Sequence, residues 1–194
     1  MYIKIKKILD YFFVVITAPI IFFIIFLFSF LIKISNPKEN IFFIQERVGY
    51  NGKVFKIFKF RTMYSSTENN TFTSSDDPRI DKLGKFLRIS RIDEVPQFIN
   101  ILLGHMSLIG PRPEQVHFVK KLTDQYGDKF NTRQKVFPGI TGLSQVEYGY
   151  VSDFDAYKKK LDYDIYYVEN MNLWMDIKIF IKTFGVLLKM YGSR

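Results

Sequence analysis

Two adjacent carboxylates, Asp93 and Glu94, have the neighbours that point most directly to chemistry in this sequence. Arg88 and Arg91 come just before them, and the turn Gly110-Pro111-Arg112-Pro113 follows the same predicted helix. Guanidinium groups bind phosphate and carboxylate oxygens bidentately, and prolines make a turn rigid. The set therefore suits phosphoryl transfer. From position alone, the alternative is an acidic pair that only stabilises a helix start.

The sequence shows no pattern of residues that would enclose a metal ion with protein ligands alone. It contains no cysteine, which excludes disulfides and thiolate metal sites. His105 and His117 each stand without a second ligand at metal spacing, and we interpret both as structural or surface residues. Mg²⁺ needs only one or two carboxylates when substrate phosphates supply the other oxygens. We therefore expect Mg²⁺ as the cofactor, with Asp93 as its protein ligand.

Two β-rich runs precede the acidic pair and predict a hairpin. They cover residues 41–48 and 53–63, and Gly49-Tyr50-Asn51-Gly52 separates them as a tight or short bulged connection. Because side chains alternate along a strand, Lys59 and Arg61 are expected on the same side of the second run. The hairpin thus places two cations on one side of its second strand.

The acidic pair itself is expected on a helix. A basic amphipathic helix is predicted over residues 79–89, and Ser90 is expected to cap a second helix that ends at a glycine. Asp93 falls in the first turn of this second helix, on the same polar face as Gln97 and Asn100. We expect Asp93 to be ionised there, because the N–H groups and dipole of a helix start favour anions.

Two irregular segments have open interpretations. Residues 65–78 are rich in Ser, Thr, Asn and Asp and form either a lid or a plain surface loop. Pro138-Gly139-Ile140-Thr141-Gly142 is a turn signal whose backbone either approaches a ligand or forms an ordinary loop.

An apolar run indicates a membrane segment. From Tyr11 to Ile32 there is no charge, and about 22 residues suffice for a helix to cross the roughly 30 Å hydrocarbon layer. The run is too long for a cleaved secretory signal. Basic residues that favour the cytoplasmic side lie on both flanks: Lys4, Lys6 and Lys7 before it, and Lys33, Lys38 and Arg47 after it. Pro19 favours a kink, so a kinked spanning helix and a broken helix that returns to the same face both stay open.

Composition and the last helix agree with a membrane surface. Aromatic residues make up 18% of the sequence, more than its core needs, so some should face lipid. The net charge of +9 suggests nucleic acid, anionic lipid or phosphorylated small substrates as partners. Residues 174–188 carry a broad apolar face opposite Lys178 and Lys182, with Lys189 just beyond. This predicts an interfacial helix, with a peripheral core helix as the alternative.

Four motifs, taken in order, resemble the bacterial sugar transferases, also called monotopic phosphoglycosyl transferases. They are Lys56-Ile57-Phe58-Lys59-Phe60-Arg61-Thr62-Met63, Asp93-Glu94-Val95-Pro96-Gln97, Met106-Ser107-Leu108-Ile109-Gly110-Pro111-Arg112-Pro113 and Pro138-Gly139-Ile140-Thr141-Gly142. With the apolar run and Tyr166-Tyr167-Val168, the resemblance covers essentially the full length. It is closest to the minimal form, a single domain over residues 1–194.

The resemblance implies an α+β, mainly helical, monotopic membrane protein. It implies a re-entrant helix at about residues 8–33, broken near Pro19, together with a short β-hairpin and interfacial amphipathic helices. The catalytic part, at about residues 40–194, would face the cytosol. The expected location is the bacterial inner membrane with the active site at its cytosolic face, and homo-oligomerisation is left open.

The resemblance also implies a two-step reaction. Asp93 would attack the β-phosphate of a UDP-sugar, release UMP and form a covalent phosphosugar enzyme. Undecaprenyl phosphate, in the lipid bilayer, would then accept the phosphosugar with Mg²⁺ assisting, which starts the assembly of a surface glycan. Glu94 is the implied catalytic partner that tunes the site or handles protons. The candidate substrate-binding residues are Lys59, Arg61, Arg88, Arg112, Pro111, Pro113 and Gln145.

Three positions depart from the family pattern. His105 stands where an acidic residue commonly precedes Met-Ser, Phe137 replaces Arg before Pro-Gly, and Glu147-Tyr148 replaces Asn-Gly. They leave the acidic pair intact but weaken the inference of nucleotide and sugar contacts. A non-catalytic membrane scaffold is the main alternative, although it would need neither the acidic pair nor the Gly-Pro-Arg-Pro turn. We expect no nucleic-acid partner, because no nucleic-acid motif is present and the apolar run argues against one.

Overall fold

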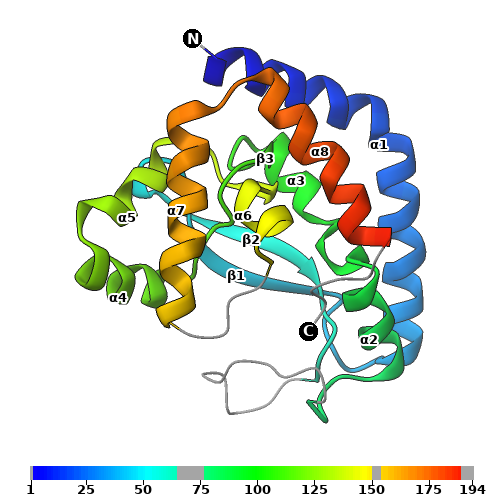
Figure 1. Cartoon of the computed structure of the whole chain (residues 1–194). Coiled ribbons are helices and arrows are strands. Elements are labelled where there is room, and N and C mark those ends of the chain that lie inside the picture. Colours follow the sequence, from blue (N-terminus) through cyan, green and yellow to red (C-terminus); the bar gives the residue numbers. More distant parts are fainter. Residues whose placement is uncertain (1, 65–76, 150–153, 189–194) are drawn as a thin grey trace.

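The computed structural model describes residues 2–64, 77–149 and 154–188, which are mainly helical with two small sheets (Figure 1). With 3-10 helices written η, the elements in chain order are α1 (Tyr2–Ser35), β1 (Phe42–Val48), η1 (Tyr50–Gly52), β2 (Val54–Phe60), α2 (Lys82–Ile89), η2 (Ile92–Glu94), α3 (Gln97–Leu102), β3 (Ser107–Ile109), α4 (Val116–Tyr126), α5 (Asp128–Thr132), η3 (Arg133–Lys135), β4 (Gly139–Thr141), α6 (Leu143–Glu147), α7 (Phe154–Asn170) and α8 (Leu173–Leu188). This content is consistent with the α+β class. The loop expected at residues 65–78 lies almost entirely outside the described residues.

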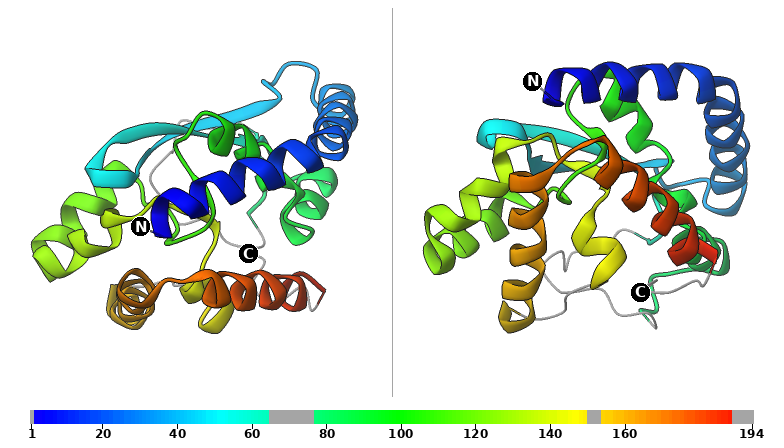
Figure 2. Two further views of the ribbon diagram at one scale, coloured as in Figure 1. Left: turned by 90° about the horizontal axis from the view of Figure 1, so that it is seen from above. Right: turned by 45° about the horizontal axis from the view of Figure 1, so that its top comes forward.

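The apolar run forms α1, which is bent near its middle. The segment is helical from end to end with Pro19 inside, and Figure 2 shows the two halves of the helix running in different directions. Proline lacks an N–H and crowds the carbonyl four residues before it. Thr17 adds to the local distortion, because its hydroxyl donates to the Phe13 carbonyl at 2.8 Å. The helix is therefore bent at the expected place but not interrupted.

Most of α1 is not covered by protein. Only 11% of its most apolar 18-residue window is buried, whereas the core helix of a soluble protein would be mostly covered. Its exposed side chains are large and apolar, and they include Phe12, Ile16, Ile20, Phe23, Phe26 and Phe30. A long helix of this composition with an uncovered apolar surface indicates a membrane-associated segment.

Both halves of α1 dock onto the same body of protein. In the first half, Lys6 forms a buried ion pair with Asp176 of α8 at 2.6 Å. The Ser107 hydroxyl, at the start of β3, donates to the buried Asp10 carboxylate at 2.6 Å. In the second half, Ile32 packs into an apolar cluster with side chains of β2 and α2. The bend thus allows one helix to contact the rest of the molecule at both ends.

The predicted hairpin is confirmed. β1 and β2 pair antiparallel, from Phe42 opposite Phe60 to Val48 opposite Val54. The connection is a single 3-10 turn in which Asn51 has φ 52° and Gly52 has φ 74°. Asn and Gly are the residues that adopt this left-handed region most readily, so the sequence of the turn explains its shape.

A second sheet was not foreseen from the sequence. β3 and β4 pair in parallel over three residues each. The pairing brings two backbones so close that a Cβ on Gly139 would lie 2.1 Å from the Gly110 nitrogen. Glycine is therefore required there, and strands this short carry no periodic pattern that a sequence could reveal.

The predicted start of the helix around the acidic pair is wrong. Ser90 does not cap a second helix, because its hydroxyl donates to the Phe86 carbonyl of α2 at 2.8 Å. Arg91 then adopts a left-handed conformation with φ 59°, which separates α2 from η2. Asp93 and Glu94 consequently lie in the 3-10 turn η2, and α3 begins only at Gln97.

The last helix leaves an apolar face exposed. α8 directs Asp176 and Ile179 inward, whereas Trp174 is 80% and Leu188 is 84% exposed. A helix with large apolar side chains on its outer face favours the interfacial interpretation over a peripheral core helix. Lys189, expected on the basic face, lies outside the described residues.

Candidate active site

Glu94 is held by two cations that come from distant parts of the chain. Lys59 of β2 lies with its Nζ 2.9 Å from Glu94 Oε1. Arg112, three residues after β3, forms a bidentate pair, with Nη2 2.6 Å from Oε1 and Nη1 3.1 Å from Oε2. The three side chains are largely buried, at 9% exposure for Glu94 and 15–16% for the cations. The structure thus brings together three of the residues expected in the site.

The charges of this group are stabilised by one another. Burial acts to raise the pKa of Glu94, but Arg112 and Lys59 outweigh it and hold the pKa well below its usual range. Burial is also the main reason that the pKa of Lys59 is lowered, with Arg112 adding repulsion and Glu94 opposing it. Glu94 is therefore an ionised carboxylate whose charge is committed to two neighbours.

Asp93 has the opposite environment. Burial and then the neighbouring charge of Glu94 raise its pKa to about 6, although Lys59, Arg112 and Arg91 act to lower it. Its Oδ1 atom is buried and accepts no hydrogen bond from the described residues. A carboxylate with that pKa is still mostly ionised at neutral pH, although Asp93 lies in the 3-10 turn η2 and not in the first turn of the expected α-helix.

The two adjacent carboxylates thus differ in what they can do. Titratable groups whose environments push their pKa values apart commonly divide the roles in a reaction. Glu94 binds the two cations. The Oδ1 atom of Asp93 has no hydrogen-bond partner among the described residues, and the pKa of Asp93 lies about one unit below neutral. Of the two, Asp93 therefore has the carboxylate oxygen that is open to a new partner, and the charges of Lys59 and Arg112 act on it.

The Gly-Pro-Arg-Pro turn holds Arg112 rigidly. Each carbonyl of its last three residues accepts a hydrogen bond. Pro111 O accepts from Gly139 N at 3.0 Å, Arg112 O from Arg133 at 2.6 Å, and Pro113 O from Arg47 at 3.0 Å. Pro111 and Pro113 are buried, so their visible role is to fix the backbone on either side of Arg112.

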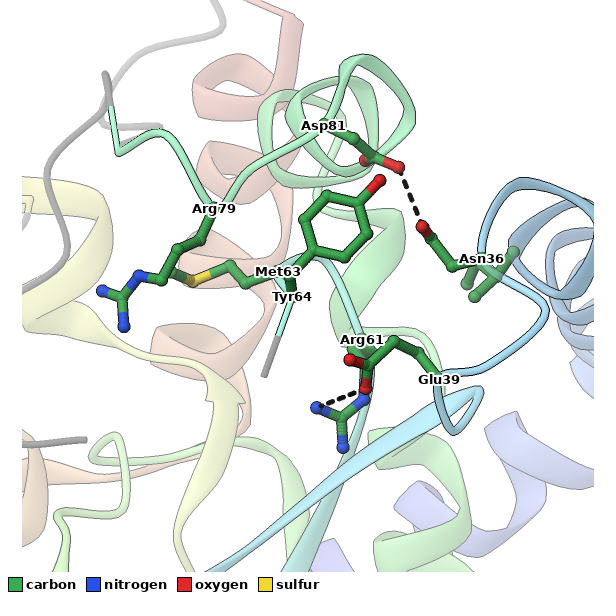
Figure 3. A pocket seen from close by; sticks show the side chains of 8 residues that line it. Asn36, Glu39, Arg61, Met63, Tyr64, Arg79 and Asp81 are labelled. Carbon is green, nitrogen blue, oxygen red and sulfur yellow. Dashed lines mark hydrogen bonds and ion pairs between the residues drawn. The ribbon is translucent and has the colours of Figure 1, made fainter. Parts of the chain in front are cut away.

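One other expected site residue, Arg61, lines a separate pocket, and a second, Arg88, contacts a side chain of that pocket. Arg61 pairs with Glu39 at 3.5 Å and lines a pocket near the end of α1, together with Asn36, Met63 and Asp81 (Figure 3). The Arg88 guanidinium approaches the Met63 sulfur at 3.3 Å from α2. Among the described residues, the structure therefore places Arg61 and Arg88 with Met63, at the end of the second β-rich run.

Gln145 lies on α6, next to the place where the paired strands β3 and β4 approach each other closely. Its Nε2 donates to the Ile140 carbonyl at 3.1 Å, and its Oε1 is a buried acceptor without a described partner. The expected turn at residues 138–142 forms β4 and the start of α6, so it belongs to the framework beside Arg112.

Two residues near the acidic pair were underestimated from the sequence. Asn100, which is fully buried, fixes β2 by donating to Lys56 O at 2.7 Å and accepting from Phe58 N at 3.1 Å. Gln97 is also fully buried, and neither polar atom of its amide has a described partner. Their spacing of three from each other and from Glu94 was the available signal, because it repeats along one helical face.

The described residues fit a metal ion that takes most of its ligand atoms from the substrate. They contain no group of three His, Asp or Glu side chains arranged for a metal ion. The buried, unpartnered Oδ1 of Asp93 suits the single carboxylate that Mg²⁺ needs beside phosphate oxygens. Both histidines are exposed, and each contacts an aromatic ring, His105 that of Phe55 and His117 that of Phe118.

The residues that depart from the family pattern make contacts with their neighbours in the structure. Phe137 stacks on Tyr50 with ring centroids 4.4 Å apart, and the Lys7 ammonium lies 4.7 Å from its ring centre. Glu147 forms an ion pair with Lys182 of α8. These contacts tie the hairpin turn and α6 to their neighbours without touching Asp93 or Glu94.

The chain is similar in sequence to known bacterial proteins. The family described as bacterial sugar transferase matches residues 1–190. A UDP-N-acetylgalactosamine-undecaprenyl-phosphate N-acetylgalactosaminephosphotransferase of Aeromonas hydrophila is 40% identical over 195 residues, which cover 100% of this chain and 46% of that protein. A UDP-glucose:undecaprenyl-phosphate glucose-1-phosphate transferase of Escherichia coli (strain K12) is 38% identical over 156 residues, 78% of this chain and 33% of that protein.

A relative of more similar length is also known. An uncharacterized sugar transferase of Bacillus subtilis (strain 168) is 35% identical over 161 residues, which cover 83% of this chain and 75% of that protein. The chain spans less than half the length of the Aeromonas and Escherichia relatives. The family match covers nearly the whole chain, and the chain therefore belongs to the bacterial sugar transferase family.

Proposed function

We propose that this chain transfers a sugar 1-phosphate from a UDP-sugar to undecaprenyl phosphate and releases UMP. The observation that carries the proposal is the division of roles in the acidic pair. Glu94 is committed to Lys59 and Arg112, while Asp93 keeps a buried, unpartnered oxygen. Relatives named for transfer of sugar phosphates to undecaprenyl phosphate support the same reaction class. The product would be the first lipid-linked sugar of a surface glycan.

The chemistry proceeds in two displacements. A carboxylate oxygen of Asp93 attacks the β-phosphorus of the UDP-sugar, the bond from that phosphorus to the bridging oxygen breaks, and UMP leaves. The phosphate oxygen of undecaprenyl phosphate then attacks the same phosphorus. The bond to Asp93 breaks, which regenerates the carboxylate and yields undecaprenyl diphosphate sugar. One difficult transfer is thereby divided into two easier ones.

The cations around the pair lower the barrier to both steps. Lys59 and Arg112 are fixed before substrate arrives, so they stabilise phosphate charge without reorganising. Mg²⁺ held by Asp93 and substrate oxygens would neutralise further phosphate charge. Arg61, Arg88 and Gln145 are proposed to contact the remaining substrate groups, and Pro111 and Pro113 to keep the Arg112 backbone in place.

The fold also supports a re-entrant α1 at the cytosolic face of the inner membrane. Both halves of this helix contact the same body, through Lys6 and Asp10 in one half and Ile32 in the other. A straight spanning helix would carry one end away from that body. A shallow helix would keep Asp93 near the headgroups, where the phosphate of a long polyprenyl chain lies while its tail stays in the bilayer.

Labelling can test this topology. The chain has no cysteine, so Lys4→Cys and Lys38→Cys each give a single reactive thiol, the first near the start of α1 and the second just after its end. In intact cells, both should resist a membrane-impermeant maleimide and react only after the cytosolic face is opened. Pro19→Leu should shift part of the population towards a spanning form. A Lys4→Cys thiol that reacts only from the outside would contradict the re-entrant arrangement.

A panel of UDP-sugars tests the activity. The purified full chain, with Mg²⁺ and undecaprenyl phosphate, should release UMP from at least one member of the panel. A membrane scaffold would release none from any of them. The active UDP-sugar identifies the donor for all later experiments.

The pH dependence should report Asp93. Because only the ionised carboxylate attacks and its pKa is raised to about 6, kcat/KM should increase with pH and level off above 7. At pH 5 it should be about tenfold below the plateau, as expected one unit below a controlling pKa. Glu94→Gln removes the negative neighbour that raises this pKa, so its acid limb should move to lower pH. A limb that stays in place in Glu94→Gln would contradict the assignment.

A further inference from the structure

A buried ion network lies directly behind the turn that carries Arg112. Its centre is Arg133 of η3, whose side chain is 4% exposed. Arg133 Nη2 donates to the Arg112 carbonyl at 2.6 Å, and its Nε and Nη2 lie 3.1 and 2.8 Å from Asp164 Oδ2. One guanidinium therefore binds both the backbone of Arg112 and a carboxylate of α7.

The same network reaches a second expected substrate-binding residue. Asp164 is 1% exposed, and its Oδ1 accepts from the Ser144 hydroxyl at 2.7 Å. Ser144 is fully buried and immediately precedes Gln145 on α6. The Arg133–Asp164 pair thus connects the carbonyl of Arg112 to the side chain of Ser144, the residue before Gln145, through two short hydrogen bonds.

The rest of the network balances its charge. Glu114 accepts from Tyr157 at 3.0 Å and from Lys160, and it lies 3.7 Å from Arg133. Two cations and two carboxylates are therefore buried together. Buried ion pairs add little stability compared with apolar packing of the same shape, and in some proteins they specify one arrangement of the chain instead. This makes position, more than stability, the property that such a network supplies.

We propose that the Arg133–Asp164 pair positions Arg112 and Gln145 relative to each other, as a pair of positioning residues for the transfer reaction. The planar fork of arginine serves two acceptors at a fixed angle, which the single ammonium of lysine does not reproduce. The proposal rests on the proposed function in that it takes Arg112 and Gln145 as substrate-binding residues. The new element of the proposal is the ion pair that holds these two residues in place.

Hydrogen exchange tests the positioning without requiring activity. Arg133→Lys keeps the charge but loses the fork, and Lys160→Met is the matched control, since it removes a cation of the same network that touches neither Arg112 nor Ser144. The amides of Gly110 and Gln145 donate to Thr141 and Gly142 at 2.9 and 3.1 Å. Their exchange should become about tenfold faster in Arg133→Lys and stay near wild type in Lys160→Met. Equal effects in both variants, or none in either, would overturn the proposal.

Kinetics of UMP release provide the second readout. Arg133→Lys should reduce kcat about 10²-fold, the scale of a small misplacement of a substrate-binding group. In an Arg112→Lys background the same change should cost less than about threefold, because it acts through Arg112. Losses that multiply in the double variant would show a merely structural role. Wild type that releases no UMP contradicts the proposed function instead, and hydrogen exchange then still decides the positioning.

Discussion

Asp93→Asn should reduce UMP release to background, a loss on the order of 10⁴-fold or more, as removal of a nucleophile does. The amide keeps the shape of the side chain but lacks the attacking oxygen. The variant should remain folded, because burial disfavours the charged form of this carboxylate, as its raised pKa shows. Its melting temperature should therefore equal or exceed that of wild type, measured in the same detergent or nanodisc preparation.

Glu94→Gln is the matched control for this change. It also neutralises one carboxylate of the pair, but it removes the buried negative charge that Lys59 and Arg112 share. Loss of one member of a buried pair costs roughly 3–5 kcal/mol, so this variant should be the less stable of the two. It should nevertheless retain measurable UMP release. Residual turnover in Asp93→Asn above that of Glu94→Gln would remove Asp93 from the nucleophile's role.

Arg112→Lys should have the second-largest effect, a loss of about 10²–10³-fold in kcat/KM, as when one fixed donor to a developing charge is removed. Lysine keeps the positive charge but replaces two parallel hydrogen bonds to Glu94 with a single contact. Arg112→Ala should lose more activity. Among the described residues, Lys59 is then the ion-pair partner that remains for Glu94.

Lys129→Ala is the control for loss of charge in this experiment. Lys129 pairs with Asp162 on the surface, where both side chains are about half exposed, and it should have wild-type kinetics. Circular dichroism must show that Arg112→Ala keeps its helical content. Wild-type turnover in a well-folded Arg112→Ala variant would exclude Arg112 from the site.

The parts of the fold that the sequence predicted have strong local patterns. The apolar run predicted α1, and Pro19 marked its bend. Alternating β-rich runs around Asn51-Gly52 predicted the hairpin and its turn. Each of these signals lies within about 30 neighbouring residues, so propensity and periodicity suffice to detect it.

The features that sequence reasoning missed depend on contacts between distant segments. The parallel pairing of β3 and β4 spans only three residues a strand, and a left-handed Arg91 converts the expected helix start into a 3-10 turn. The partners of Glu94 come from positions 59 and 112, and no local pattern links them to it. Their meeting sets the pKa difference between the two carboxylates, which the residue types alone do not reveal.

The most direct test of the two-step mechanism is mass spectrometry of the protein itself. The full chain, incubated with Mg²⁺ and its active UDP-sugar but no lipid acceptor, should gain the mass of one phosphosugar on the peptide that contains Asp93. UMP should appear in equal amount, and Asp93→Asn should gain nothing. Adding undecaprenyl phosphate should remove the adduct. If UMP forms only when the lipid acceptor is present and no adduct can be trapped, the acceptor attacks the nucleotide sugar directly and the covalent mechanism is wrong.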